Sequence, residues 1–425
     1  MDHQLKRFIV KSSSNAFGNP VFLRIWLANL ISGMAVAAHD TAATWMMNSM
    51  SPSGLFISLM ASLASLPFFL FTLPAGALAD ALNETRIMRL MNLWLAACGG
   101  VLALLGWTGN LNPVLLLTGV FLLGVGFAVN APASASALNG MQLNISGILG
   151  PALAGVLLLK VGAPVIFALN ALGFLLVSSA IPRLNKTSLD LGQAFSMSGH
   201  SIARALSYVG RSRGLRNVLF VNVVFSSFVV AIPALAPVLL LKELHLDGSS
   251  LGLVFASLGT GSVVSAIFVL PRLRSRFSSI VLIAVAQLIL AGTYLLMAIV
   301  NHCVYCLGLM FVAGASWAVA GSELWVIAQR AMANSVRGRA SAIMIVASQG
   351  AMTFGGFVWG LSGNLAGTRT TLFAIGSIFF TITVAGLLFR KLLEIIGGLP
   401  PRHREKQISQ LKPHTNAPGK LPSLL

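Results

Sequence analysis

The chain has 425 residues, of which 56% are hydrophobic and only 9% are charged. An average soluble domain carries about 25% charged residues, so most of this surface must face lipid or other helices. The 28 Lys and Arg residues outnumber the 10 Asp and Glu residues. In a soluble protein this excess would favour nucleic-acid binding. Here the basic residues lie in short connectors between apolar runs, so no nucleic-acid partner is expected.

Twelve apolar stretches are long enough to cross a bilayer, which takes about 20 helical residues. They cover residues 21–47, 54–79, 87–107, 112–130, 136–159, 163–182, 217–241, 249–271, 279–300, 304–328, 338–361 and 369–389. The sequence therefore predicts an all-α membrane protein with about twelve transmembrane helices.

The distribution of basic residues predicts the orientation of these helices. If both termini lie inside, all Lys and Arg residues fall on the inner side except Lys160, Lys242 and Arg369. Cytoplasmic connectors are enriched in Lys and Arg, and shifting the pattern by one span would destroy the agreement. The N-terminal segment also lacks the apolar core of a cleaved signal peptide. Both termini are therefore expected in the cytoplasm.

The longest connector, residues 183–216, divides the spans into two sets of six. It contains a basic amphipathic segment that is expected either to lie on the membrane surface or to cap the bundle. The expected order is as follows: a cytoplasmic segment 1–20, a six-helix bundle 21–182, the cytoplasmic connector 183–216, a second six-helix bundle 217–389, and a basic, disordered tail 390–425.

The segment LPAGALADALNETRIM, residues 73–88, lies in the turn between the second and third spans. Gly76 would let helices approach closely, Asp80 would cap or pair at a helix end, and Arg86 would supply a cation. The segment resembles the loop signature of the major facilitator superfamily, although the match weakens after Asp80. This resemblance implies two pseudo-symmetric six-helix bundles with a substrate site between them. A short polar turn with a capping Asp explains the same residues without the family.

Three further segments, around WMMNSMSPSGLF, SALNGMQLNISGILGPALAG and VRGRASAIMIVASQG, narrow the resemblance. Over residues 20–390 the chain is similar to a bacterial exporter branch that includes the enterobactin exporter and related drug and siderophore efflux proteins. Gly147, Gly150, Pro151 and Gly155 in the fifth span resemble the Gly-Pro motif of proton-coupled drug antiporters. Glycine permits close helix contact and proline bends the helix, which suits a rocking element. Static packing explains these residues equally well.

The connector between the fourth and fifth spans departs from this branch. The branch has a longer inner loop here, whereas Asn130-Ala131-Pro132-Ala133 runs almost directly into Ser136-Ala137-Leu138-Asn139. The corresponding connector in the second half, from Gly321 to Arg339, is much longer. This difference leaves open a tight working turn, shifted span boundaries or an impaired copy.

Asp40 is one of few acidic residues at membrane depth. A charged side chain costs about 2.5–3.5 kcal/mol at the centre of a spanning helix, so its presence demands a reason. It lies on the order of 9 Å outward of the middle of the first span. Asp40 is therefore the first candidate for a proton carrier. The alternative is a structural carboxylate that bonds Thr41, Thr44 or a neighbouring helix.

Glu323, on the order of 10 Å inward of the middle of the tenth span, is the second proton-coupling candidate. The candidates for an inner gate that pairs with it are Arg330, Arg337 and Arg339. No phosphate-binding motif, no paired carboxylates beside a nucleophile and no metal-ligand spacing occur in the sequence. The chain is therefore not expected to be an enzyme or to need a metal or cofactor, and a proton gradient would drive its transport.

Together, these features and the resemblance predict a secondary transporter in the bacterial inner membrane. It would export a drug-like or siderophore-like small molecule by proton antiport with alternating access, acting as a monomer in the lipid bilayer. Two alternatives stay open at this point. One is a non-transporting or impaired membrane scaffold, and the other is an importer with the same fold.

Overall fold

The computed structural model describes residues 20–51, 53–81, 84–130, 137–181, 206–332 and 337–396, and in these ranges it contains helices and no strands. Residues 1–380 form one compact unit, and residues 381–425 form another.

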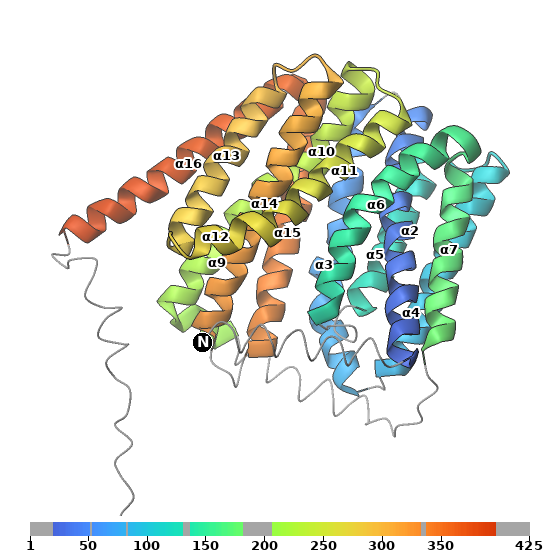
Figure 1. Ribbon diagram of the computed structural model, residues 1–425, viewed down its shortest axis with the longest axis horizontal. Helices are drawn as coiled ribbons and strands as arrows, with labels where there is room; N and C mark the ends of the chain where they lie inside the picture. Colours follow the sequence, from blue (N-terminus) through green and yellow to red (C-terminus); the bar gives the residue numbers. More distant parts are fainter. Residues whose placement is uncertain are drawn as a thin grey trace, which may run out of the picture. The chain divides into compact units, whose positions relative to one another are not determined.

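The first half of the chain contributes six helices (Figure 1). They are α2 (Pro20–Met50), α3 (Gly54–Ala81), α4 (Glu84–Trp107), α5 (Pro113–Asn130), α6 (Ala137–Val161) and α7 (Ala163–Ala180). The second half begins with two segments that contain a π-helical stretch. One is α9 (Arg213–Val229), α10 (Ala231–Val238) and η2 (Leu239–Glu243), and the other is α11 (Gly248–Val264), η3 (Ser265–Val269) and α12 (Leu270–Arg274). The remaining helices are α13 (Ser279–Met297), α14 (Cys303–Ala331), α15 (Arg337–Ala366) and α16 (Thr368–Ile396).

Each of the twelve predicted apolar stretches overlaps one helical segment of the described chain. Ten of these segments are long and apolar enough to cross a membrane, and α6 contains a shorter apolar helix over Ile148–Val161. The remaining segment, α2, is 31 residues long. The prediction of an all-α protein with about twelve spanning helices is confirmed.

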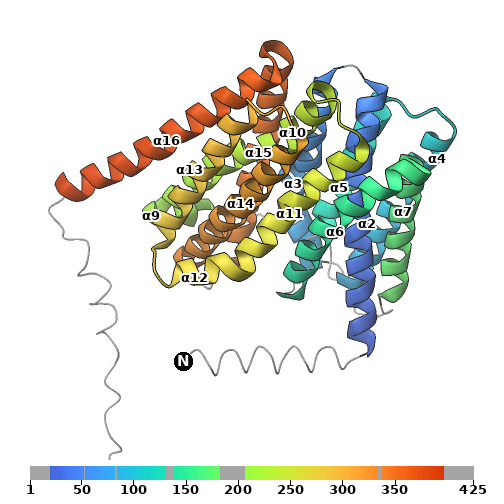
Figure 2. The same ribbon diagram turned by 45° about the horizontal axis from the view of Figure 1, so that its top comes forward.

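The helices pack mainly within their own half. In the first half α2 packs on α6 and α7, α4 on α5 and α7, and α3 on α5. In the second half α11 and α13 pack on α14, and α9 packs on α15. Two extensive helix–helix interfaces join the halves, α3 with α15 and α6 with α11. Figures 1 and 2 show α6 beside α11.

Small residues allow α6 and α11 to approach closely. A Cβ added to Gly252 would lie 2.5 Å from the backbone oxygen of Pro151. A Cβ added to Gly155 would lie 3.0 Å from the backbone oxygen of Ser249. Any larger side chain at either glycine would therefore push these two helices, and with them the two halves, apart.

Part of the predicted amphipathic connector lies among the described residues. Residues 206–211 are helical, and Val209 is buried in a cluster with Ala328 and Ile343. The Tyr208 hydroxyl donates a hydrogen bond to the Ala331 carbonyl at 3.3 Å. These contacts favour a connector that caps the ends of α14 and α15 over one that lies free on the membrane.

Candidate functional site

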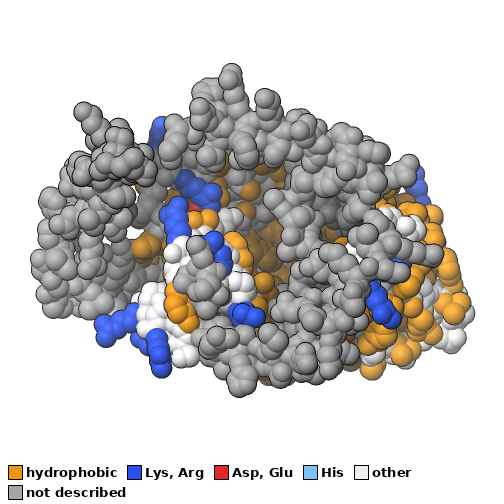
Figure 3. All heavy atoms as spheres, turned by 90° about the horizontal axis from the view of Figure 1, so that it is seen from below, with side chains coloured by type: hydrophobic (Ala, Val, Ile, Leu, Met, Phe, Trp, Pro, Cys, Tyr) orange, Lys and Arg blue, Asp and Glu red, His pale blue; other side chains and the backbone are white. Residues whose placement is uncertain are grey.

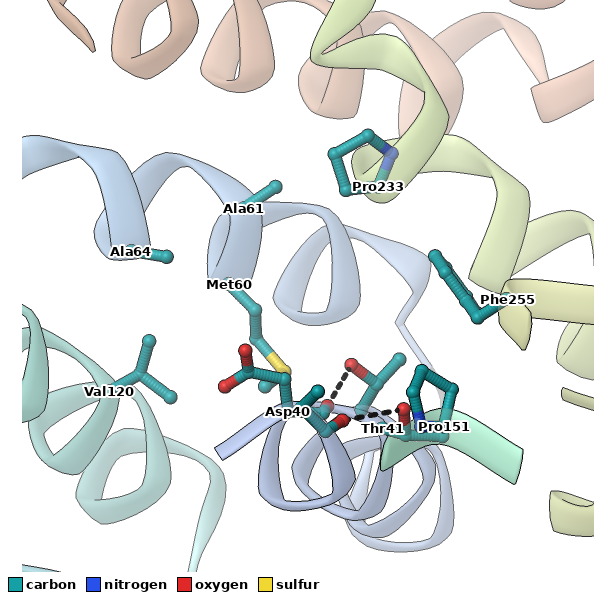
Figure 4. A pocket seen from close by; sticks show the side chains of 11 residues that line it. Asp40, Thr41, Met60, Ala61, Ala64, Val120, Pro151, Pro233 and Phe255 are labelled. Atoms are coloured by element: carbon teal, nitrogen blue, oxygen red, sulfur yellow. Dashed lines mark hydrogen bonds between the residues drawn. The ribbon is translucent and has the colours of Figure 1, made fainter. Parts of the chain in front are cut away.

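A cavity of about 270 Å³ lies between the two halves (Figure 4). Four helices of the first half and two of the second contribute its walls. The lining residues are Ala37, Asp40, Thr41 and Thr44 of α2, Met60, Ala61 and Ala64 of α3, Val120 of α5, Pro151 of α6, Pro233 of α10 and Phe255 of α11. The resemblance implied a site between two bundles, and this cavity occupies that place.

Asp40 is the charged residue of this lining. Its side chain is exposed, and Figure 4 shows its carboxylate on the side of Met60 and Val120. The Thr41 hydroxyl donates to the Ala37 carbonyl at 3.0 Å, and the Thr44 hydroxyl donates to the backbone carbonyl of Asp40 at 2.8 Å. The carboxylate therefore receives no hydrogen bond from either threonine. Among the described residues it has neither a hydrogen-bond donor nor a cationic partner.

His39 lies next to Asp40 in sequence but faces another helix. Its side chain is buried, and its ring centroid lies 4.5 Å from that of Phe167 on α7. Neither ring nitrogen has a hydrogen-bond partner. Successive helical residues differ by about 100°, which places these two polar side chains on different sides of α2.

Contacts between the halves lie beyond the cavity, toward the ends where α2 finishes and α3 begins. The Lys242 ammonium donates to the carbonyls of Asn48 at 3.1 Å and Ser51 at 2.6 Å. The Ser58 hydroxyl donates to the Ala234 carbonyl at 2.9 Å. Asn48 lies one helical turn beyond Thr44, so these bonds join the two halves on the side of the cavity toward the end of α2, which is the upper side in Figure 1.

The opposite, lower face is the one at which α2 begins. Figure 3 shows this face, with hydrophobic side chains at the bottom of a recess and Lys and Arg side chains around its described part. The start of α9, the end of α14 and the start of α15 carry exposed arginines, namely Arg213, Arg330, Arg337 and Arg339, and Arg211 just before α9 is also exposed. The lower face is therefore the basic one, as the charge pattern of the connectors predicted.

Glu323 lies outside the cavity, in the last third of α14. Its side chain is 1% exposed, and it forms an ion pair with Arg274 at the end of α12. The predicted pairing with Arg330, Arg337 or Arg339 is wrong. The Glu323 carboxylate pairs with Arg274 instead, and the other three arginine side chains are exposed. Arg330 lies about 10 Å further along the same helix, whereas α12 brings Arg274 alongside.

The loop signature is only partly described. Among the described residues, a Cβ added to Gly76 would meet nothing within 4 Å, so no close helix approach is found there, and the predicted approach stays a prediction. Arg86 is exposed. The side chain of Asp80 lies outside the described residues, and its expected capping or pairing stays a prediction.

The glycines of the fifth span make two different contacts. A Cβ added to Gly150 would lie 2.5 Å from the Ala37 Cβ on α2, while Gly155 faces α11. Pro151 lies between them and lines the cavity. The surroundings of Gly147 lie outside the described residues. The short connector also falls there in part, between the end of α5 at Asn130 and the start of α6 at Ala137.

Sequence reasoning missed several residues of this arrangement. The sequence could have singled out Lys242, because it is one of only three basic residues on the outer side of the predicted topology. Arg369 is another, and it forms an ion pair with Glu243 at 2.8 Å. Met60 and Phe255 had no such signal, since an apolar residue facing a cavity resembles one facing lipid.

Comparison with known proteins places this chain in a family. The chain matches the model of the transmembrane secretion effector family over residues 11–412. It is 21% identical over 291 residues to macrolide efflux protein A of Streptococcus pyogenes, which covers 64% of this chain and 71% of that protein.

Solved transporters share the fold at low sequence identity. A bacterial homolog of the human lysosomal transporter Spinster, in an inward-facing and unoccupied conformation, has a TM-score of 0.67 at 15% identity, with 90% of this chain and 98% of that chain covered. The nucleoside transporter NupG has a TM-score of 0.68 at 12% identity, with 88% and 100% covered.

The fold, the cavity between two halves and these matches define a membrane transporter of the major facilitator type. The chain belongs to the transmembrane secretion effector family.

Proposed function

We propose that this protein exports a small molecule across the bacterial inner membrane by proton antiport, with the lower face of Figure 1 and both termini in the cytoplasm. It would act as a monomer and need no cofactor other than the proton gradient. The relationship to a macrolide efflux protein supports export. The arginine-rich lower face supports the orientation.

The free carboxylate of Asp40 is the observation that carries this proposal. Antiport needs a group that takes up a proton when the cavity opens to one side and releases it when the cavity opens to the other. Asp40 lines the cavity and has no partner among the described residues that would hold it ionised permanently. It can therefore exchange its proton whenever the cavity contains water.

The contacts between the halves support alternating access. Lys242 and the crossing of α6 with α11 hold the upper ends together, so the cavity in this structure would load from the lower side. Opening the upper end requires Lys242 to leave two carbonyl oxygens. A positive charge that can return to water at the upper surface makes this contact reversible.

The test is a transport assay in energised inside-out vesicles. With the wild-type chain, adding radiolabelled erythromycin, a macrolide, should give ATP-independent uptake into the vesicles that stops when a protonophore removes the gradient. Vesicles that carry the Asp40→Asn chain should show no gradient-driven uptake at equal expression. Uptake that survives the protonophore would contradict proton coupling, and uptake only in right-side-out vesicles would indicate an importer.

A further inference from the structure

We propose that the cavity selects hydrophobic monovalent cations over anions and neutral solutes of the same shape. This inference rests on the proposed function in taking the Asp40 cavity as the transport site. The preference for a positively charged ligand follows from the described lining, which combines one unpaired carboxylate with hydrogen-bond acceptors and apolar walls.

The polar groups of the lining are acceptors. Thr41 and Thr44 give their hydroxyl protons to backbone carbonyls of α2, so only their oxygen lone pairs remain for a ligand. The carboxylate of Asp40 adds two more acceptor oxygens when it is ionised. A protonated amine would satisfy these groups, whereas the carboxylate or phenolate of an anionic solute would find no donor among the described lining residues.

The nearest basic group, Lys242, does not supply the missing hydrogen-bond donor to the cavity. Lys242 donates to the carbonyls of Asn48 and Ser51, where the upper ends of the two halves meet, and is not part of the cavity lining. An ionised carboxylate in an apolar cavity is unfavourable unless a cation or a proton neutralises it. A cationic ligand and a proton would therefore compete for Asp40.

The remaining walls suit an apolar body around that charge. Met60, Val120 and Phe255 reach the cavity from three helices, with Pro151 and Pro233 from two more (Figure 4). Methionine adapts its shape to different apolar groups, and an aromatic ring face attracts a cation. The volume of the cavity in this conformation is about 270 Å³, near the lower limit for ligand pockets.

Competition at one carboxylate fixes the stoichiometry of exchange. Asp40 is the titratable group among the described lining residues from α2, α3, α5, α6, α10 and α11, and neighbouring His39 faces Phe167 on α7. One site that carries either one proton or one monovalent cation exchanges them one for one. Such exchange moves no net charge across the membrane.

The binding test uses purified full-length protein and two ions of nearly the same shape, tetraphenylphosphonium and tetraphenylborate. Triphenylphosphine oxide serves as the neutral probe. We expect the wild type to bind the phosphonium at least ten-fold more tightly than the borate or the oxide. Asp40→Asn should lose at least ten-fold in phosphonium affinity and keep its affinity for the oxide, whereas Asp40→Glu should retain most of the phosphonium binding.

Asp247→Asn is the matched control, because it removes one negative charge outside the cavity and should leave phosphonium binding unchanged. If Asp40→Asn does not fold, calorimetry of the wild type in buffers of different ionisation enthalpy replaces it. At a pH where Asp40 is protonated, one proton should leave for each phosphonium bound. Equal affinity for phosphonium and borate, no phosphonium binding, or binding without proton release would overturn the inference.

Reconstituted vesicles separate this inference from the proposed function. Phosphonium flux should follow an imposed pH gradient and should be unaffected by a potassium diffusion potential. Asp40-dependent phosphonium binding without proton-driven flux would contradict the proposed antiport and leave the binding inference standing. Proton-driven export of a neutral or anionic compound, with no phosphonium binding, would contradict the inference alone.

Discussion

Asp40 and Glu323 are both acids at membrane depth, and their surroundings differ in two respects, exposure and ion pairing. Glu323 is 1% exposed and paired with Arg274, whereas Asp40 is exposed in a cavity and has no partner among the described residues. The Glu323 carboxylate is held in an ion pair by an arginine of a neighbouring helix. An unpaired acid beside water can gain and lose a proton. The comparison therefore favours Asp40 over Glu323 as the group for the proposed proton exchange, although sequence alone made both candidates.

The largest expected effect separates the two acids directly. Asp40→Asn should abolish proton-driven efflux, because the amide keeps the size of the side chain but cannot release a proton. Glu323→Gln should retain measurable proton-driven efflux at matched expression. Efflux from inside-out vesicles, with and without a protonophore, measures both. A wild-type rate and pH profile in Asp40→Asn would reverse the assignment and make Glu323 the next acid to test.

The next largest effect, a loss of stability, is expected when Arg274, the cation paired with Glu323, is removed. Arg274→Ala leaves the buried Glu323 carboxylate without a counter-charge, which should cost about 3 kcal/mol of stability. Glu323→Gln should cost less, because the Arg274 side chain is 43% exposed and water can solvate it. The double variant Arg274→Gln with Glu323→Gln should recover most of the loss. Thermal unfolding in detergent measures the series, and equal losses in both single variants would contradict the proposed asymmetry.

His39 tests whether the neighbour of Asp40 shares its role. Its ring packs against Phe167 and both nitrogens lack hydrogen bonds, so His39→Phe should keep the ring contact and remove unsatisfied polar atoms. We expect retained proton-driven efflux and stability raised by about 1 kcal/mol. His39→Ala is the control and should be destabilised by the void it leaves. Loss of proton coupling in a folded His39→Phe variant would show that Asp40 does not act alone.

The smallest expected effect concerns Asp247, an acid outside the membrane at the start of α11. Its carboxylate accepts hydrogen bonds from the Ser250 backbone N–H at 2.9 Å and the Ser249 hydroxyl at 2.8 Å. Hydrogen bonds from Ser250, with a further one from Ser249, lower the pKa of Asp247. Asp247→Ala should cost about 1 kcal/mol, the usual loss of a helix N-cap.

The pH dependence of this cap has a definite sign. Because the folded-state pKa is lowered, the ionised cap contributes its full stability above the unfolded pKa of about 3.9 and loses it as the pH falls through the lowered value. The difference in unfolding temperature between wild type and Asp247→Ala should therefore be constant from neutral pH to about 5 and shrink below about 4. A difference that grows toward acid pH would contradict the cap's charge-assisted role.

The sequence by itself determined the number of helical segments and the basic lower face. Each apolar stretch depends only on about 20 consecutive residues, and the orientation depends on Lys and Arg counts in the connectors between them. The cost of burying a charge also singled out Asp40 and Glu323. These are local properties that packing does not alter.

The tertiary structure decided which acid has a partner and which side chains form the cavity. Arg274 lies 49 residues from Glu323 in sequence, and no local pattern connects them. Met60 and Phe255 come from opposite halves, and their hydropathy is the same whether they face lipid, another helix or a cavity. In a membrane all three surroundings accept apolar side chains, so only the packing of α2 and α3 against α10 and α11 distinguishes the site from the surface.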